Sequence, residues 1–147
     1  VRDGDSAYLR FEEKDIRNMA DTFDLELSDE EVSIIAQYPV RAPIVMRITS
    51  DAKDTSGDAH RRDRSVPEDA YRHVLWSYLL TQKFGPEFAE MVTDAHETLP
   101  TNTAAERRMD FHNNRIGREL AQQGVKRDRI LWLVRHDARI IRYPEDA

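Results

Sequence analysis

The sequence lacks cysteine altogether, has only five glycines, and has no apolar run near the roughly 20 residues that a membrane-spanning helix needs. The absence of cysteine excludes disulfides, thiolate metal ligands and cysteine nucleophiles, so a metal site would have to use histidine and carboxylate side chains. Neither a glycine-rich phosphate loop nor an internal repeat is present. Residues 1–5 are polar and are not typical of a signal peptide, so we expect any export signal to lie outside this chain.

The net charge is −6 at pH 7 and is unevenly spread along the chain. Residues 1–59 hold 7 basic and 14 acidic side chains, whereas residues 99–147 hold 10 basic and 7 acidic ones. Nonspecific nucleic-acid binding depends mainly on neutralising phosphates, so the acidic total argues against it. The basic C-terminal third could face an anionic group or pair with the acidic N-terminal third. We favour the pairing because solvated charge is the commoner case.

Apolar residues recur at helical spacing through most of the chain. They predict an all-α, single-domain bundle of about six or seven helices over residues 1–147. The motif-bearing core is expected at 28–124, with 1–27 and 125–147 peripheral. The expected helices lie at residues 11–23, 28–38, 43–52, 66–83, 86–97, 104–123 and from 128 onward.

Local signals predict where some of these elements begin and end. Ser28 and Glu31 have the spacing of a capping box, in which each side chain binds the backbone of the other residue. Ser65 is expected to cap the following helix in a similar position. The polar, aperiodic segment 53–65 is predicted to be a loop. The β-branched tail at 140–143 is compatible with a short C-terminal strand.

Polar and aromatic residues follow one face of the helix expected at 66–83. Asp69, Arg72, His73 and Trp76 stand at i, i+3, i+4 and i+7 and form what we call the first stripe. Burying ionisable groups is costly unless they pair with each other, with a metal or with a ligand. Asp69 could hold one imidazole nitrogen of His73 and leave the other for a metal or a proton. Arg72 could bind an anionic substrate, and Trp76 could wall the site. The alternative is structural, with Asp69 supporting the helix dipole and His73 a satisfied core residue.

The helix expected at 104–123 carries the same spacing in Asp110, Asn113, Asn114 and Gly117, which we call the second stripe. Asparagine inside a helix lowers its stability, and buried side-chain amides need partners. A glycine in mid-helix suggests a close approach by another helix or a ligand. The alternative is a polar clasp, in which Asp110 and the two asparagines bind His73 or Arg72 and only hold the helices together.

A third cluster of ionisable groups, His96 and Glu97, falls at a predicted helix end. Adjacent residues of a helix point about 100° apart, so an unbroken helix does not present both to one ion. Either His96 binds and Glu97 acts as a base, or one of the two is structural, since a histidine at a helix end also complements the dipole.

Taken in order, these motifs resemble a widespread bacterial helical domain family with the pattern D-A-[FY]-R-H-x-x-W, then D-A-H-E, then M-D-x-x-N-N-x-x-G. They are found here at residues 69–76, 94–97 and 109–117, and residues 38–42 resemble a shorter upstream signature. The resemblance covers about residues 28–124. It implies that the two stripes and His96-Glu97 form one shared site. It also implies a secreted, envelope-associated or toxin-like bacterial setting, and it names no substrate.

We therefore expect a hydrolase with its site between the helices at 66–83, 86–98 and 104–123. In this hypothesis His73, His96 and Asp110 bind a divalent ion such as Zn, Mn or Fe, or position a water, and Glu97 is the general base. The remaining expected roles follow from chemistry and position: Arg72 catalytic, Trp76, Asn113 and Asn114 substrate-binding, and Asp69 and Gly117 structural or supporting.

Two alternatives remain open from the sequence. One is a metal-free enzyme without a cofactor, in which Glu97 and His96 carry out acid–base work on a glycan or ester. The other is a non-enzymatic envelope or effector module whose polar stripes only clasp the helices. The expected partners are an unidentified substrate and, for an effector, a cognate partner protein. The expected location is secreted or periplasmic rather than cytoplasmic.

Overall fold

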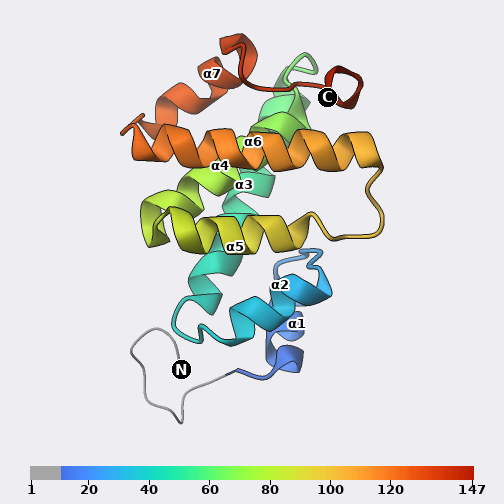
Figure 1. Cartoon of the computed structure of the whole chain (residues 1–147), viewed down its shortest axis with the longest axis vertical. Helices are drawn as coiled ribbons and strands as arrows, with labels where there is room; N and C mark the ends of the chain where they lie inside the picture. Colours follow the sequence, from blue (N-terminus) through green and yellow to red (C-terminus); the bar gives the residue numbers. More distant parts are fainter. Residues whose placement is uncertain (1–10) are drawn as a thin grey trace.

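The computed structural model describes residues 11–147, and within this range it contains seven α-helices, two short 3-10 helices and no strand (Figure 1). The expected all-α single-domain fold is thereby confirmed for the described residues. Residues 1–5, expected not to be a signal peptide, lie outside that range. No helix of residues 11–147 is both long enough and apolar enough to cross a membrane. The α-helices are α1 (Glu13–Thr22), α2 (Asp29–Ala36), α3 (Ala42–Arg62), α4 (Glu68–Phe84), α5 (Pro86–His96), α6 (Ala104–Gln122) and α7 (Ile130–His136).

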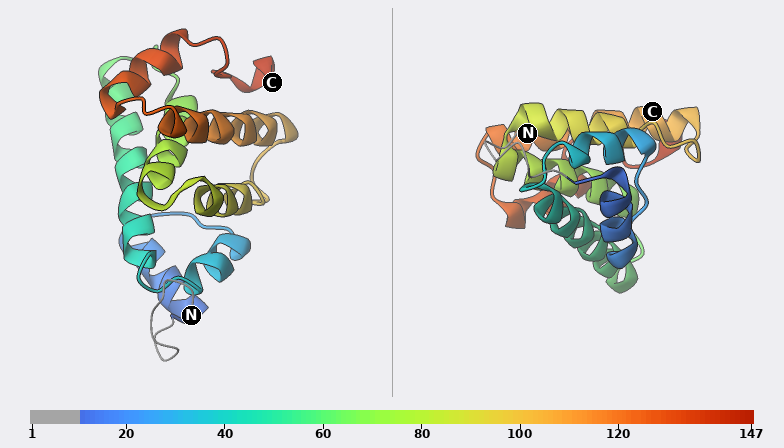
Figure 2. Two further views of the ribbon diagram at one scale, coloured as in Figure 1. Left: turned by 60° about the vertical axis from the view of Figure 1, so that its left-hand side comes forward. Right: turned by 90° about the horizontal axis from the view of Figure 1, so that it is seen from below.

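Helix α4 is the central element and packs against α3, α5, α6 and α7. Its buried residues lie on nearly every side of the helix, which is typical of a helix enclosed by its neighbours. Helices α5 and α6 run antiparallel, side by side, and a long connector joins them (Figure 1). Helix α3 extends along the flank of the domain, from the end that carries α1 toward the end that carries α7 (Figure 2). The ends of α4, α5 and α6 that carry the polar motifs are thereby brought together.

The predicted side-chain cap of α2 forms, and the one predicted for α4 does not. Ser28 and Glu31 form the predicted capping box at the start of α2, and Thr103 forms another at the start of α6. The prediction for Ser65 was wrong. Helix α4 begins at Glu68 with Pro67, not Ser65, in the N-cap position, and it has no side-chain cap. The Ser65 hydroxyl donates to the Asp63 carboxylate at 2.7 Å.

The predicted loop at 53–65 was wrong for most of its length, since α3 continues to Arg62. The hydroxyl of Ser56 donates to the carbonyl oxygen of Ala52 at 2.8 Å, so this polar side chain is satisfied within the helix itself. Ala52 and Ser56 stand four residues apart and are both fully buried. The inward face of this part of α3 therefore consists of small and polar residues, which a search for large apolar side chains at helical spacing does not detect.

The C-terminal tail forms no strand at 140–143. The side-chain amide of Asn113 takes the place of a strand partner: it donates to the carbonyl oxygen of Ile141 at 2.7 Å and accepts from the backbone N–H of Ile141 at 3.0 Å. Ile140 is buried in the same hydrophobic core as Ile130 and Val134 of α7. One asparagine thus fastens the tail onto α6.

Among the described residues, an ion pair joins the basic C-terminal third to the acidic first part of the chain. Arg127 forms a bidentate pair with the carboxylate of Asp51 on α3, at 2.8 and 2.9 Å. This ion pair is of the kind that the internal-pairing hypothesis predicts.

Candidate functional site

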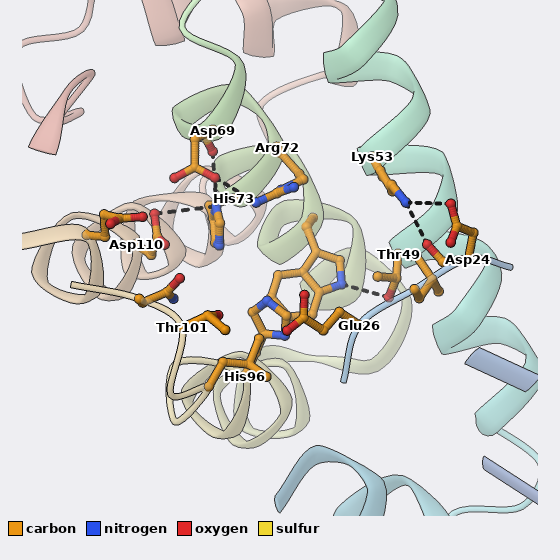
Figure 3. A pocket seen from close by; sticks show the side chains of 15 residues that line it. Asp24, Glu26, Thr49, Lys53, Asp69, Arg72, His73, His96, Thr101 and Asp110 are labelled. Carbon is orange, nitrogen blue, oxygen red and sulfur yellow. Dashed lines mark hydrogen bonds and ion pairs between the residues drawn. The ribbon is translucent and has the colours of Figure 1, made fainter. Parts of the chain in front are cut away.

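A pocket of about 530 Å³ opens between α3, α4, α5 and α6 (Figure 3). All four residues of the first stripe line it, together with His96 of α5 and Asp110 of α6. Lys53 of α3 and Asp24 lie at another side of the pocket and are joined to each other by an ion pair. Residues from three distant motifs of the sequence therefore meet around one accessible space.

His73 is the centre of the buried part of this site, with only 3% of its side chain exposed. Its Nδ1 lies 3.0 Å from the backbone carbonyl oxygen of Asp69, 3.4 Å from Asp69 Oδ1 and 3.5 Å from Asp110 Oδ1. Its Nε2 lies 3.7 Å from Glu97 Oε2. The i, i+4 spacing on α4 brings Asp69 to the ring, while α6 and the end of α5 supply the other two carboxylates. Oxygen atoms thus face both nitrogens of one imidazole.

The pKa values of Asp69 and Asp110 are shifted in opposite directions in this environment. Burial alone would raise the pKa of Asp69, but its hydrogen bond to His73 and the charges of His73 and Arg72 lower it below its usual range. Burial and the neighbouring carboxylates of Asp69 and Glu97 raise the pKa of Asp110. Within this pair Asp69 is therefore the stronger acid and Asp110 the weaker one.

Glu97 lies behind His73 and is absent from the lining of the pocket. Asn114 donates to Glu97 Oε2 at 2.6 Å, and both side chains are buried. Burial raises the pKa of Glu97, against the opposing charges of His73 and His96 and the hydrogen bond from Asn114. The structure therefore places Glu97 beside His73 Nε2 and outside the lining of the pocket.

His96 faces the pocket and is held from behind by a residue that sequence reasoning assigned only to a helix cap. Its Nδ1 lies 2.6 Å from Glu31 Oε1, the same oxygen that accepts the backbone N–H of Ser28. The Glu31 side chain is 1% exposed and that of His96 is 18% exposed. A carboxylate can only accept, so Nδ1–H of His96 donates and Nε2 remains free of this contact. The signal for Glu31 was its position four residues before the buried Ile35, which puts it on the inward face of α2.

The pKa of His96 is the net result of opposing influences. Burial lowers it, but the hydrogen bond and negative charge of Glu31, together with the charge of Glu97, outweigh burial and raise it. The ring is therefore protonated over a wider pH range than a histidine free in water.

Arg72 and Trp76 complete the wall of the pocket. The guanidinium of Arg72 donates to Asp69 Oδ1 at 2.7 Å while much of the side chain stays exposed. The indole N–H of Trp76 donates to Thr49 Oγ1 at 2.9 Å, and its ring meets that of His96 edge to face, with centroids 5.1 Å apart. One cation and one large aromatic surface therefore flank the two histidines.

A family model matches residues 32–138, which include the three motifs and all the helices from α3 to α7. The chain belongs to the family described as a domain of unknown function (DUF6973). No curated protein and no solved structure matches it. The match extends beyond residue 124 into α7, in keeping with the burial of Ile130 and Val134 in the core.

Two residues of the second stripe lie outside the site. Asn113 is occupied by the C-terminal tail at Ile141. Gly117 lies against α4, where an added Cβ would collide with the Val74 carbonyl oxygen and come within 3.1 Å of the Tyr78 backbone nitrogen. The absence of a side chain at Gly117 therefore allows α6 to approach the backbone of α4 closely.

Proposed function

We propose that this domain is a hydrolase in which His96, oriented by Glu31, transfers protons in the pocket. The observation that carries the proposal is a partly exposed imidazole in an open pocket, bound at Nδ1 by a buried carboxylate. A histidine held in this way keeps one tautomer and presents Nε2 to the pocket, which is the arrangement of general bases that activate water or a hydroxyl group.

The neighbouring residues support the same chemistry. His96 Nε2 would take a proton from a water molecule as its oxygen attacks the substrate, and would then return that proton to the leaving group. Arg72 would stabilise the negative charge that develops on the substrate oxygen. Trp76 excludes water from one side and strengthens these interactions. Esters and phosphoesters, including phospholipids, and glycans of the cell wall are the substrate classes that suit a cation beside a proton-transfer group.

The resemblance of the motifs to secreted and toxin-like bacterial chains supports a secreted, envelope or effector setting for this activity. A cognate partner protein fits the effector case. The expected role of Glu97 as general base has less support than that of His96, because Glu97 is buried behind His73.

The test is a substrate panel that compares wild type with His96→Gln. The panel contains p-nitrophenyl acetate, bis(p-nitrophenyl) phosphate, phosphatidylglycerol vesicles and purified peptidoglycan, and mass spectrometry identifies the products. We expect hydrolysis of at least one substrate by wild type and a loss of about 100-fold or more in His96→Gln, the scale of a general base. His136→Gln, the same change on α7 outside the pocket, is the matched control and should keep full activity. Equal turnover by wild type and His96→Gln would refute the proposal.

A second candidate function, a non-enzymatic interaction module, is favoured by one specific observation. Hydrogen bonds of Asn113, Asn114 and Ser77, buried or partly buried, join α6 to the tail, to Glu97 and to α4. These contacts lock helices together and need no ligand. A wild-type protein that hydrolyses nothing in the panel would favour this module.

A further inference from the structure

We propose that Asp69, His73 and Asp110 form a binding site for one divalent metal ion, on the side of the pocket away from Lys53 and Asp24 (Figure 3). This site stands independently of the hydrolase proposal, because an ion can bind there with or without a substrate. It also differs from the set expected from the sequence, in which His96 was a ligand and Asp69 was not.

The distances between the three side chains are those of ligands around one ion. One ligand atom from each residue lies within 4.8 Å of the others. His73 Nδ1 is 3.4 Å from Asp69 Oδ1 and 3.5 Å from Asp110 Oδ1. Two ligand atoms that bind a tetrahedral ion at about 2.1 Å are themselves about 3.4 Å apart. The three side chains can therefore reach one ion with little rearrangement.

A second observation points to a missing positive partner. The Asp110 side chain is only 5% exposed, and its Oδ1, the atom turned toward His73, has no hydrogen-bond donor. Buried carboxylate oxygens are normally satisfied, and one left without a donor destabilises the fold. A metal ion between Asp110 Oδ1 and His73 Nδ1 would supply the interaction that this oxygen lacks.

The charges around His73 favour a divalent cation in the same place. Three carboxylates, those of Asp69, Asp110 and Glu97, lie within 3.7 Å of the His73 ring nitrogens. The guanidinium of Arg72 forms an ion pair with one of these three carboxylates, that of Asp69. Two positive charges placed among these carboxylates would remove most of their mutual repulsion.

Glu97 has the position of an outer support for a metal-bound histidine. Histidine ligands commonly donate their second ring N–H to a carboxylate, which fixes the tautomer. With an ion on Nδ1, the His73 proton would move to Nε2, which faces Glu97 Oε2 at 3.7 Å. Asn114 in turn holds that carboxylate at 2.6 Å. The contact of Nδ1 with the Asp69 carbonyl oxygen would then be exchanged for the bond to the ion.

The composition of the site indicates which ions it would take. One imidazole nitrogen and two carboxylate oxygens suit Zn²⁺, Mn²⁺ or Fe²⁺. All three ligands also line the pocket, so the remaining coordination positions open to water or a substrate. Such an open position is typical of catalytic rather than structural sites.

The test is isothermal titration calorimetry of the chelator-stripped protein with Zn²⁺ and, separately, with Mn²⁺. We expect one ion per chain for wild type and a Kd at least 100-fold weaker for Asp110→Asn, which keeps the shape of the side chain. Asp69→Asn, at a more exposed position, should weaken binding in the same direction. Asp94→Asn on α5 is the matched control with unchanged affinity. Circular dichroism of each variant checks that it is folded.

His96→Gln separates this proposal from the hydrolase proposal. It should bind the ion as tightly as wild type, since His96 is not a ligand here, even though it is expected to lose hydrolysis. Absence of one-to-one binding by wild type for both ions would overturn the metal site. Equal affinity in wild type, Asp69→Asn and Asp110→Asn would also overturn it. Neither result would bear on hydrolysis by a His96 that needs no metal.

Discussion

The first and second stripes have the same spacing in the sequence, but they differ in how many of their residues line the pocket. Every residue of the first stripe lines the pocket, but Asp110 is the only residue of the second stripe that does so. Asn113 binds the tail, Asn114 binds Glu97, and Gly117 lies against the α4 backbone. Buried polarity alone therefore does not indicate a functional site. What separates Asp110 from Asn113 is that Oδ1 of Asp110 has no donor, whereas the side-chain amide oxygen and nitrogen of Asn113 both bind Ile141.

The largest effect on stability is expected at Asn113, whose side-chain amide is hydrogen-bonded at both its oxygen and its nitrogen. Asn113→Asp keeps the shape of the side chain but removes the donor to the Ile141 carbonyl oxygen and buries a charge beside it. We expect a loss of about 3 kcal/mol in the free energy of unfolding, measured by urea denaturation. A change near zero would show that the tail is not held by this amide.

Gly117→Ala tests the close approach of α6 to α4. The new Cβ would collide with backbone atoms, which cannot turn away as a flexible side chain can. We expect a loss of about 2 kcal/mol by the same denaturation measurement, in the range of overpacked cores. The control is Ala105→Ser, a small change near the start of α6, which should leave stability within about 0.5 kcal/mol of wild type. Gly124→Ala would not serve as a control, because Gly124 has φ +75 and a side chain there would strain the backbone.

Asp110→Asn is the mirror image of Asn113→Asp and should act in the opposite direction. In chelator-treated protein it removes like-charge repulsion from Asp69 and Glu97, so we expect unchanged stability or a gain of about 1 kcal/mol. Differential scanning fluorimetry would detect the gain as a higher Tm. A loss as large as that of Asn113→Asp would show that Asp110 is a structural clasp like its neighbour.

The smallest expected effect is the change with pH in the stability that the Glu31–His96 pair contributes. The pKa of His96 is raised in the folded protein, so the pair stabilises the fold fully below the unfolded pKa of histidine, about 6.5. That contribution is lost as the pH rises through the folded pKa. Unfolding free energies of wild type and His96→Gln, measured between pH 5 and 9, should therefore converge toward high pH. A gap that widens with pH would contradict a raised pKa.

Helix types and most boundaries were predictable because their signals are local. The Ser28–Glu31 box and the apolar periodicity of α4 lie within a few residues of the structures that they specify. Helix α3 was predicted to end too early because Ser56 and its polar neighbours are typical of loops, whereas the Ser56 hydroxyl donates to the backbone of the helix itself. Polar residues at helical spacing within an apolar helix also predicted the first stripe, because that signal lies within one helix.

The contacts that define the site could not be predicted in this way. Glu31 and His96 are 65 positions apart, and a capping role already accounted for Glu31. Asn113 finds its partner 28 residues further along, in a tail that was compatible with a strand. Which stripe residues are satisfied is decided by the packing of other elements against them, and the periodicity of one helix carries no such information.

The most direct measurement is an anomalous-difference map from crystals of the protein grown with Zn²⁺ or Mn²⁺. The metal proposal predicts one strong peak within bonding distance of Asp69, His73 Nδ1 and Asp110, with Glu97 turned toward His73 Nε2. Crystals saturated with either ion in which these side chains bind only one another would contradict it.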